Sequence, residues 1–222
     1  MMDGGAKLLA VAILTVSATF VAAQNPASSS DNLKKANVRP SASPLPSTSV
    51  EPFSNATVAQ MAAQCVTLDT EQGAIVIEVL PDRAPQTVRN FLNLAASGAL
   101  DTTTFSRVVR GFVIQGGNLS TSEHWGAELA TRMQRMLPDE PNDVKHVRGI
   151  VSMARGDEPN TATTHFFILV GDGPHLDGKF AAFGRVLRGM EVADAINRAE
   201  IEDEKPFVPV HIKHASVLSC EK

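Results

Sequence analysis

The residue best suited to chemistry is Arg107, which lies in the largely apolar segment FSRVVRGFVIQGGN, residues 105–118. A guanidinium is a hydrogen-bond donor that keeps its positive charge in proteins. If the segment forms strands, Arg107 projects from the face opposite to Ser106 and Val108, because side chains alternate along a strand. A charge in an apolar setting is costly unless it has a partner or a function. The segment alone leaves open whether Arg107 is functional or a rim residue of an ordinary sheet.

Other residue types that support catalysis lack the spacing that catalysis requires. No pair of histidines combines ligand spacing with a cysteine or carboxylate partner, so no metal site is predicted. There is no GxSxG motif for a hydrolase nucleophile, and Gly116-Gly117 is not followed by the lysine of a phosphate-binding loop. We therefore expect neither a metal nor another cofactor. The histidines considered are His124, His146, His165, His175, His211 and His214.

The composition is that of a slightly acidic globular protein. The chain has 222 residues, of which 43% are hydrophobic and 20% charged, with a net charge of −4 and a pI of about 5.9. This charge is not complementary to nucleic acid or to an anionic membrane surface. The chain has no tyrosine and one tryptophan, Trp125, so an aromatic platform for stacking bases is not expected. We predict no nucleic-acid partner.

Residues 1–23 have the pattern of a signal peptide. Lys7 supplies a positive charge, residues 8–21 form an apolar run, and Val21-Ala22-Ala23 offers small residues for cleavage before Gln24. The run is short for a membrane span, which needs about 20 apolar residues. The pattern predicts an exported protein, periplasmic or secreted. An uncleaved segment that serves as a membrane anchor is the alternative.

Residues 24–62 are predicted to form a flexible linker, and residues 63–222 a folded domain. The linker is rich in Ser and Pro up to about Phe53 and has few large apolar side chains, so it buries too little surface to offset the entropy of ordering. The end of the linker, residues 54–64, is compatible with a short helix that begins at Ser54 or Asn55.

The folded domain shows more strands than helices. Both helices stand between strands, and there is neither a regular strand–helix alternation nor a repeat period. This order favours an antiparallel sheet or closed barrel with two peripheral helices. Strands are predicted over residues 66–69, 74–79, 105–109, 112–115, 149–153, 165–170, 180–187 and 208–218, helices over 81–98 and 189–199, and a partly helical excursion over 120–137.

Four segments of the domain resemble the cyclophilins, the peptidyl-prolyl cis–trans isomerases. FSRVVRGFVIQGGN is similar to the family's FxR…GFxxQGG core. GIVSMARGDEPNTATTHFFILV, HLDGKFAAFGRVLRGMEVADAI and RAPQTVRNFLNLAASG resemble three further family segments in the same order along the chain. The resemblance covers Val66–Leu218. It implies an eight-stranded antiparallel β-barrel closed by two α-helices, with a binding site on its outer face.

The resemblance also assigns the site residues. Arg107 matches the catalytic arginine, and Gln115 matches the glutamine that holds the substrate backbone. The chain departs from common family residues at Ser106, Arg110, Val113, His165, His175 and Phe180. Ala154 and Arg155 match the segment that pairs with the peptide, and the apolar pocket comprises Phe112, Val113, Phe167, Leu176 and Phe180.

The resemblance implies an isomerase that acts on Xaa-Pro bonds of unfolded or flexible polypeptides, as a monomer, and assists the folding of exported proteins. A non-catalytic module that binds prolyl peptides on the same fold is the alternative. The two cysteines, Cys65 and Cys220, are expected to be bonded, since the family's first and last strands are neighbours and an exported protein meets an oxidising environment. Two unpaired thiols are the alternative from composition alone.

Overall fold

The computed structural model describes residues 51–220. The predicted signal peptide, residues 1–23, and residues 24–50 of the predicted linker lie outside the described residues. No helix of the described part is long and apolar enough to cross a membrane.

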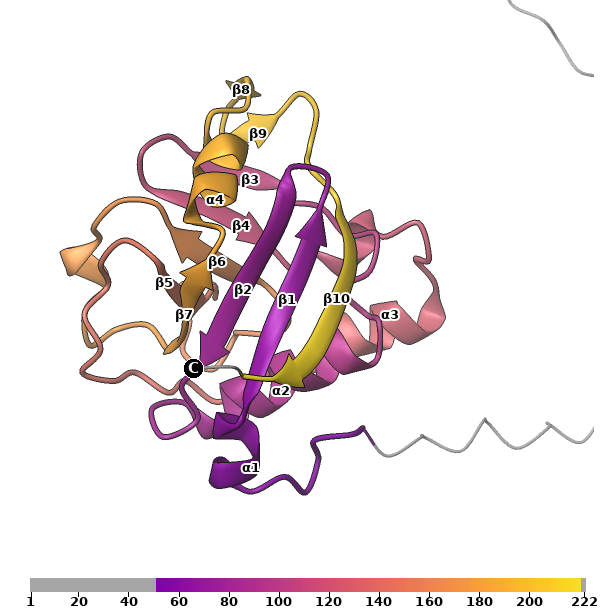
Figure 1. The fold of residues 1–222 in the computed structure, drawn as a ribbon, viewed down its shortest axis with the longest axis vertical. Coiled ribbons are helices and arrows are strands. Elements are labelled where there is room, and N and C mark those ends of the chain that lie inside the picture. Colours follow the sequence, from indigo (N-terminus) through magenta and orange to yellow (C-terminus); the bar gives the residue numbers. More distant parts are fainter. Residues whose placement is uncertain (1–50, 221–222) are drawn as a thin grey trace, which may run out of the picture. The chain divides into compact units, whose positions relative to one another are not determined.

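The described residues form a mainly β protein built on one eight-stranded antiparallel sheet, in the order β10-β1-β2-β7-β5-β6-β4-β3. This confirms the predicted fold class. Figure 1 shows β10, β1 and β2 side by side on the near face. The strands of this sheet are β1 (Gln64–Thr70), β2 (Gly73–Val79), β3 (Arg107–Val109), β4 (Val113–Gly116), β5 (Ile150–Met153), β6 (Phe166–Leu169), β7 (Ala182–Arg188) and β10 (Ile212–Ser219).

The two edges of this sheet are joined by residues that precede β3 and β10. Thr104 and His211 form an isolated antiparallel bridge. The amide of Phe105 donates to the carbonyl of Val210 at 3.0 Å, and the amide of Ile212 donates to that of Thr103 at 2.7 Å. Backbone groups that an open edge would leave unpaired are thus satisfied, and the sheet curls into a barrel.

Two helices cover the barrel as predicted: α2 (Pro85–Ala96) packs against β7 and β10, and α4 (Met190–Asn197) packs against β2, β3 and β4. Pro85 begins α2, where its missing N–H costs nothing. The apolar residues of α2 spaced three and four apart, Val88, Phe91 and Leu92, are all buried. Two shorter helices are also present in the described part, α1 (Val58–Ala62) and α3 (Ala127–Met133), with 3₁₀ turns η1 (Leu119–Thr121) and η2 (Pro174–Leu176).

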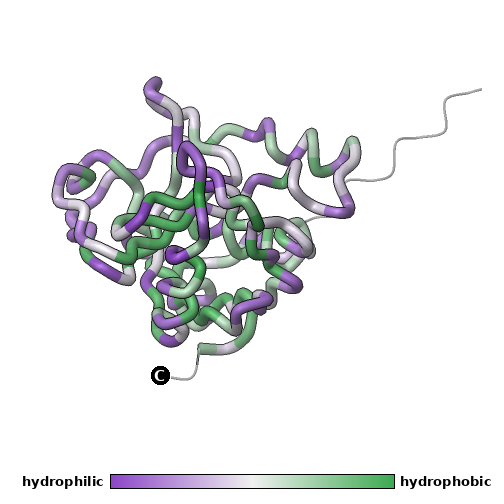
Figure 2. Tube along the Cα trace, turned by 90° about the horizontal axis from the view of Figure 1, so that it is seen from above, coloured by the Kyte–Doolittle hydropathy of each residue, from purple (hydrophilic) through white to green (hydrophobic). Residues whose placement is uncertain are grey.

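The alternation of side chains along the strands produces two separate apolar clusters. On β6, Phe166 and Ile168 point into the barrel, whereas Phe167 and Leu169 belong to a second cluster on its outer face. The inner cluster includes the fully buried rings of Phe91 and Phe183, and burial of one such side chain contributes about 1.5–3 kcal/mol. Figure 2 shows the hydrophobic segments gathered at the centre of the molecule.

Residues 51–57, which the sequence analysis placed in the linker, lie against α2. The amide of Phe53 donates to Asn93 Oδ1 at 2.8 Å, and the Arg89 guanidinium donates to the carbonyl of Phe53 at 3.2 Å. The helix that follows begins after Thr57, whose side chain and that of Gln60 form a capping box. The expected N-caps, Ser54 and Asn55, are wrong because these residues are in the turn before Thr57.

A small two-stranded sheet, β8 (Ile201–Glu202) and β9 (Lys205–Pro206), was not predicted. Its turn consists of Asp203 and Glu204, which have φ angles of 48° and 65°. Positive φ at both central residues is the mark of a type I′ turn, whose twist matches that of paired strands. The hairpin extends from the end of α4 and lies at the top of the view in Figure 1.

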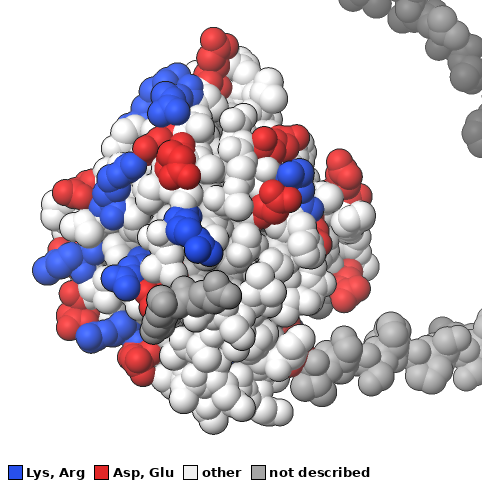
Figure 3. All heavy atoms as spheres, in the orientation of Figure 1, with Lys and Arg blue, Asp and Glu red and all other residues white. Residues whose placement is uncertain are grey.

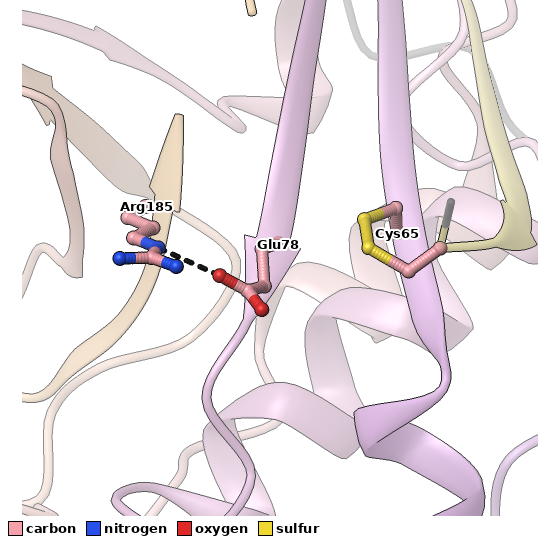
Figure 4. Close-up of a disulfide and its surroundings, with 4 residues drawn as sticks. Cys65, Glu78 and Arg185 are labelled. Atoms are coloured by element: carbon pink, nitrogen blue, oxygen red, sulfur yellow. Dashed lines mark hydrogen bonds and ion pairs between the residues drawn. A yellow bond between two sulfur atoms is a disulfide. The ribbon is translucent and has the colours of Figure 1, made fainter. Parts of the chain in front are cut away.

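The cysteines are bonded: Cys65 in β1 and Cys220 after β10 form a disulfide with a Cα–Cα distance of 4.8 Å. Figure 4 shows the bond beside β1, and next to it the ion pair of Glu78 on β2 with Arg185 on β7 at 2.6 Å. On the face drawn in Figure 3, positive and negative side chains are interspersed, so this face has no extended region of one sign.

Candidate functional site

A row of side chains crosses four strands on the outer face of the barrel. Arg107 on β3 is paired with Gln115 on β4, Gln115 with Phe167 on β6, and Phe167 with Ser152 on β5. Paired residues of antiparallel strands project from the same face. The register therefore places the predicted Arg107, Gln115 and Phe167 side by side, although they span 60 residues of sequence.

The polar end of this row is formed by Arg107. Its Nη1 donates to Gln115 Oε1 at 3.3 Å, and its Nε donates to Glu204 Oε2 at 2.7 Å. The Arg107 side chain is 44% exposed. The guanidinium therefore stands at the surface with two anchors, beside the apolar cluster, where a ligand on this face can reach it.

The apolar end of the row is a single cluster. Val113, Phe167 and Leu176 are its buried floor, with exposed fractions of 2%, 6% and 9%. Phe112 and Phe180 are partly exposed and pack against this floor. The Phe167 and Phe180 rings meet edge to face with centroids 6.1 Å apart, a favourable geometry for aromatic pairs. The apolar residues expected from the sequence, with Ala154, are thus all brought together.

Ala154 and Arg155 follow β5 along the edge of this cluster. The amide of Ala154 donates to the carbonyl of His165 at 3.0 Å, which extends the pairing of β5 with β6. The Arg155 guanidinium lies 5.1 Å from the centroid of Phe180, within cation–π range. Its Nη1 donates to the carbonyl groups of Gly156 and Asp157 at 2.9 and 3.2 Å. Arg155 therefore orders the loop that borders the cluster as well as covering Phe180.

The turn between β3 and β4 is held by α4. The buried side chain of Asn197 donates to the carbonyls of Val109 and Val113 at 2.9 and 3.1 Å and accepts from the amide of Gly111 at 2.8 Å. Arg110, one of the departures from the family pattern, donates to the carbonyl of Ala199 at 3.0 Å. A cation at the C-terminus of a helix is favourable, which accounts for the arginine at this position.

The end of β4 approaches the loop before β6 closely. Gly117 has a φ of +81°, and a Cβ atom on it would lie 2.2 Å from the carbonyl oxygen of Thr164. The hydroxyl of Thr164 donates to the carbonyl of Gly117 at 2.8 Å. A glycine is required here, because any side chain would separate the two segments. The contact keeps Gln115 in register with Phe167.

A network of the buried Ser152 and His146 with the partly exposed Asp177 lies at the far end of the row. His146 Nε2 is 3.1 Å from Ser152 Oγ, and its Nδ1 is 3.3 Å from Asp177 Oδ1. These are the residue types of a hydrolase triad, but Ser152 has no exposed surface and cannot meet a substrate in this structure. Burial lowers the pKa of His146 below its usual value, although Asp177 opposes this.

The residues that the structure describes contain no cluster of three or more His, Cys, Asp or Glu that could hold a metal ion.

A cavity of about 330 Å³ lies between the β1–β2 turn and the end of α4. It is lined by residues such as Glu71, Arg198 and Phe207, and it shares no residue with the row.

Glu204 is a residue of the site that was not predicted from the sequence. The residue lies in a short hairpin with no periodic pattern, and its partner Arg107 is 97 residues away along the chain. The network of His146 and Asp177 was missed for the same reason, since its residues are common ones without a local motif. The acidic run of residues 202–204 is the one sequence signal that could have indicated a charged hairpin here.

Comparison with known proteins identifies the family. The family model described as cyclophilin type peptidyl-prolyl cis-trans isomerase/CLD matches residues 65–217. The mouse peptidyl-prolyl cis-trans isomerase-like 3 is 38% identical over 156 residues, which cover 68% of this chain and 94% of the mouse protein. Peptidyl-prolyl cis-trans isomerase A of the bacterium Dickeya dadantii is 36% identical over 161 residues, covering 70% and 83%.

A solved structure gives the same result. The cyclophilin-type isomerase of Cryptosporidium parvum, crystallised in the presence of the dipeptide Ala-Pro, superimposes with a TM-score of 0.62 and 31% sequence identity. The match covers 70% of this chain and 99% of that protein. With four collinear segments, the barrel and the row of Arg107, Gln115 and Phe167, these matches show that the chain belongs to the cyclophilin-type peptidyl-prolyl cis–trans isomerase family.

Proposed function

We propose that this protein catalyses the cis–trans isomerisation of Xaa-Pro bonds in polypeptides, with Arg107 as its catalytic residue. The rotation has a barrier of about 18–20 kcal/mol, because the amide must lose its resonance. No bond is broken, so the reaction needs neither a nucleophile nor a metal. As the bond twists, the prolyl nitrogen regains a lone pair that can accept a hydrogen bond.

Arg107 is suited to recognise the twisted bond. Its guanidinium stays protonated and donates hydrogen bonds that the nitrogen of a planar amide cannot accept. An interaction made only in the transition state accelerates the reaction. A hydrogen bond from a charged donor contributes about 1.5–3 kcal/mol, which corresponds to roughly a ten- to hundredfold acceleration. The remaining acceleration must come from orientation and exclusion of water.

The apolar cluster and the polar groups beside it would supply this orientation. Phe112, Val113, Phe167, Leu176 and Phe180 form a wall that can hold the proline ring. Gln115 would hold the carbonyl side of the bond, and the segment of Ala154 and Arg155 would pair with the peptide backbone. The observation that carries the proposal is the single row in which Arg107 and Gln115 adjoin Phe167.

The test is the isomerase activity of the full chain and of Arg107→Ala, measured by NMR exchange on a Xaa-Pro peptide. We expect kcat/KM to fall at least about tenfold, the value for a lost contribution of ~1.4 kcal/mol, with thermal stability unchanged. Stability should not change because exposed ion pairs contribute about 0–1 kcal/mol.

The matched control is Arg188→Ala, which removes an exposed arginine of β7 that takes no part in the row. It should keep full activity. Full activity in Arg107→Ala would refute the assigned role. A wild-type chain that binds the peptide without accelerating exchange would instead support the non-catalytic prolyl-peptide module.

We also propose that the protein acts on unfolded or flexible exported proteins, as a monomer outside the cytoplasm. The pattern of residues 1–23 supports export, and the disulfide between Cys65 and Cys220 is a bond typical of oxidising compartments. Intact-mass analysis of protein isolated from the producing cells should show a chain that begins at Gln24 and has no free thiol. A chain that retains residues 1–23, or that has two free thiols, would contradict export with cleavage.

A further inference from the structure

The β8–β9 hairpin touches the strand of Arg107 at two consecutive positions. Glu204 Oε2 accepts from Arg107 Nε at 2.7 Å, and the carbonyl of Glu204 accepts from the amide of Val108 at 2.8 Å. The side-chain contact and the backbone contact therefore come from one residue. A small change in the hairpin would move the carboxylate relative to the guanidinium.

The backbone of Glu204 indicates that its side chain has a role. Glu204 has a φ of 65°, in the left-handed region, and the type I′ turn it occupies favours Gly, Asn or Asp. A residue with a long side chain is disfavoured there relative to glycine. Strained residues persist at sites where the side chain has a function, and here that side chain reaches Arg107.

The two side-chain contacts of Arg107 use Nε and Nη1 of its guanidinium. Glu204 in the β8–β9 turn accepts from Nε and Gln115 on β4 accepts from Nη1, so two acceptors from different elements hold the planar group. Among the residues that the structure describes, Nη2 of Arg107 has no acceptor. A guanidinium held in this way retains N–H donors for a substrate and loses less rotational freedom when it binds.

We propose that Glu204 is a positioning residue for the isomerase reaction: it fixes the plane of the Arg107 guanidinium so that Nη donors meet the twisting bond. This inference rests on the proposed function. An autoinhibitory ion pair would be different, because its carboxylate would accept hydrogen bonds from the Nη groups that the substrate needs.

Three substitutions in the full chain separate positioning from support of the hairpin. Glu204→Ala removes the acceptor and keeps a strained residue, and we expect kcat/KM to fall three- to tenfold, mainly through kcat. Glu204→Gly removes the acceptor but relieves the backbone strain, so it should be as slow as Glu204→Ala while being at least as stable. Glu204→Gln keeps an oxygen that can accept from Nε, and it should retain most of the activity.

The matched control is Glu202→Ala, which removes an exposed acid of the same hairpin that has no contact with Arg107. It should behave as wild type. Recovery of activity in Glu204→Gly would show that Glu204 only supports the turn. Unchanged or increased activity in Glu204→Ala would also overturn the proposal, and an increase would identify the pair as inhibitory.

A second readout does not depend on activity. The ¹⁵N NMR signal of Arg107 Nε–H, assigned by its loss in Arg107→Ala, should exchange slowly with water in wild type and Glu204→Gln, and rapidly in Glu204→Ala and Glu204→Gly. If wild type is inactive, the proposed function and the positioning role both fail, whatever this signal shows. If wild type is active and Arg107→Ala is not, a rapidly exchanging signal in wild type refutes the positioning role alone.

Discussion

The two apolar clusters of this barrel share strands but differ in what surrounds them. The inner cluster is formed by the sheet together with buried residues of α2 and α4, and the rings of Phe91 and Phe105 meet Phe166 within it at centroid distances of 5.2 and 6.3 Å. The outer cluster is open at Phe112 and Phe180 and is bordered by the row that ends in Arg107. Adjacent residues of β6, Phe166 and Phe167, belong to different clusters.

Along β6, a residue of the core and a residue of the candidate binding site are therefore immediate neighbours in sequence. Because side chains alternate, a shift of one residue in the pairing of β6 would exchange the two clusters. The register is therefore needed for function as much as for stability. Gly117, which brings β4 close to the loop before β6, is one of the residues that maintain it.

The largest effect should come from the inner cluster. Phe166→Ala removes a fully buried ring and should lower the free energy of unfolding by about 3–5 kcal/mol. The molecules that remain folded should keep nearly wild-type kcat/KM, because Phe166 does not face the outer cluster. Urea denaturation and NMR exchange on the same samples measure both quantities.

Phe167→Ala tests the neighbouring position and should give the opposite pattern. We expect a smaller loss of stability, because the outer cluster that Phe167 joins is open to solvent at its rim, and a fall in kcat/KM of about tenfold, because the floor of the pocket is lost. If both substitutions changed stability and activity in the same proportion, the division between the clusters would have no functional meaning.

A smaller effect should come from pH, through two histidines next to the outer cluster. Burial lowers the pKa of His146 and of His165. Below the usual histidine pKa of about 6.5 the unfolded chain therefore takes up protons that the folded chain resists. Stability should fall as the pH falls below this value, by no more than about 1.4 kcal/mol per pH unit for each histidine.

Urea denaturation at pH 7.5 and 5.5 measures this slope. His165→Gln should reduce it, because this substitution removes a histidine whose pKa burial lowers. Asp177 contributes in more acidic solution, because the amide of His146 lowers its pKa. A slope that is the same in wild type and His165→Gln would show that His165 does not titrate differently on folding.

The barrel and the row were predictable because they depend on local patterns and family motifs. Alternation located the strands, and the helical spacing of Val88, Phe91 and Leu92 located α2. Pairing then followed from the resemblance, which brought the segments of Arg107 and Phe167 together. The alternation of side chains along each strand left the role of Arg107 open, because alternation does not show which strands pair with one another.

The missed features depend on contacts that have no local pattern. Strands of two residues show no periodicity, so the hairpin of Glu204 was not predicted. Thr57 caps α1 where Ser54 and Asn55 were expected, because several residues of this segment can cap and the hydrogen bonds to Gln60 decide between them. The network of His146 joins it to Ser152 and Asp177, which are 6 and 31 residues away along the chain and share no local motif with it.

The pairing of β1 with β10 determines when, during synthesis, the barrel can be completed and the disulfide can form. Cys65 and Cys220 are 155 residues apart, and at synthesis rates of about 5–20 residues per second the second cysteine follows the first by roughly 8–30 s. During this interval β1 lacks one of its two neighbours and Cys65 has no partner. The nascent chain thus exposes a strand edge of the kind that other chains can pair with, until the strand that closes the barrel has been made.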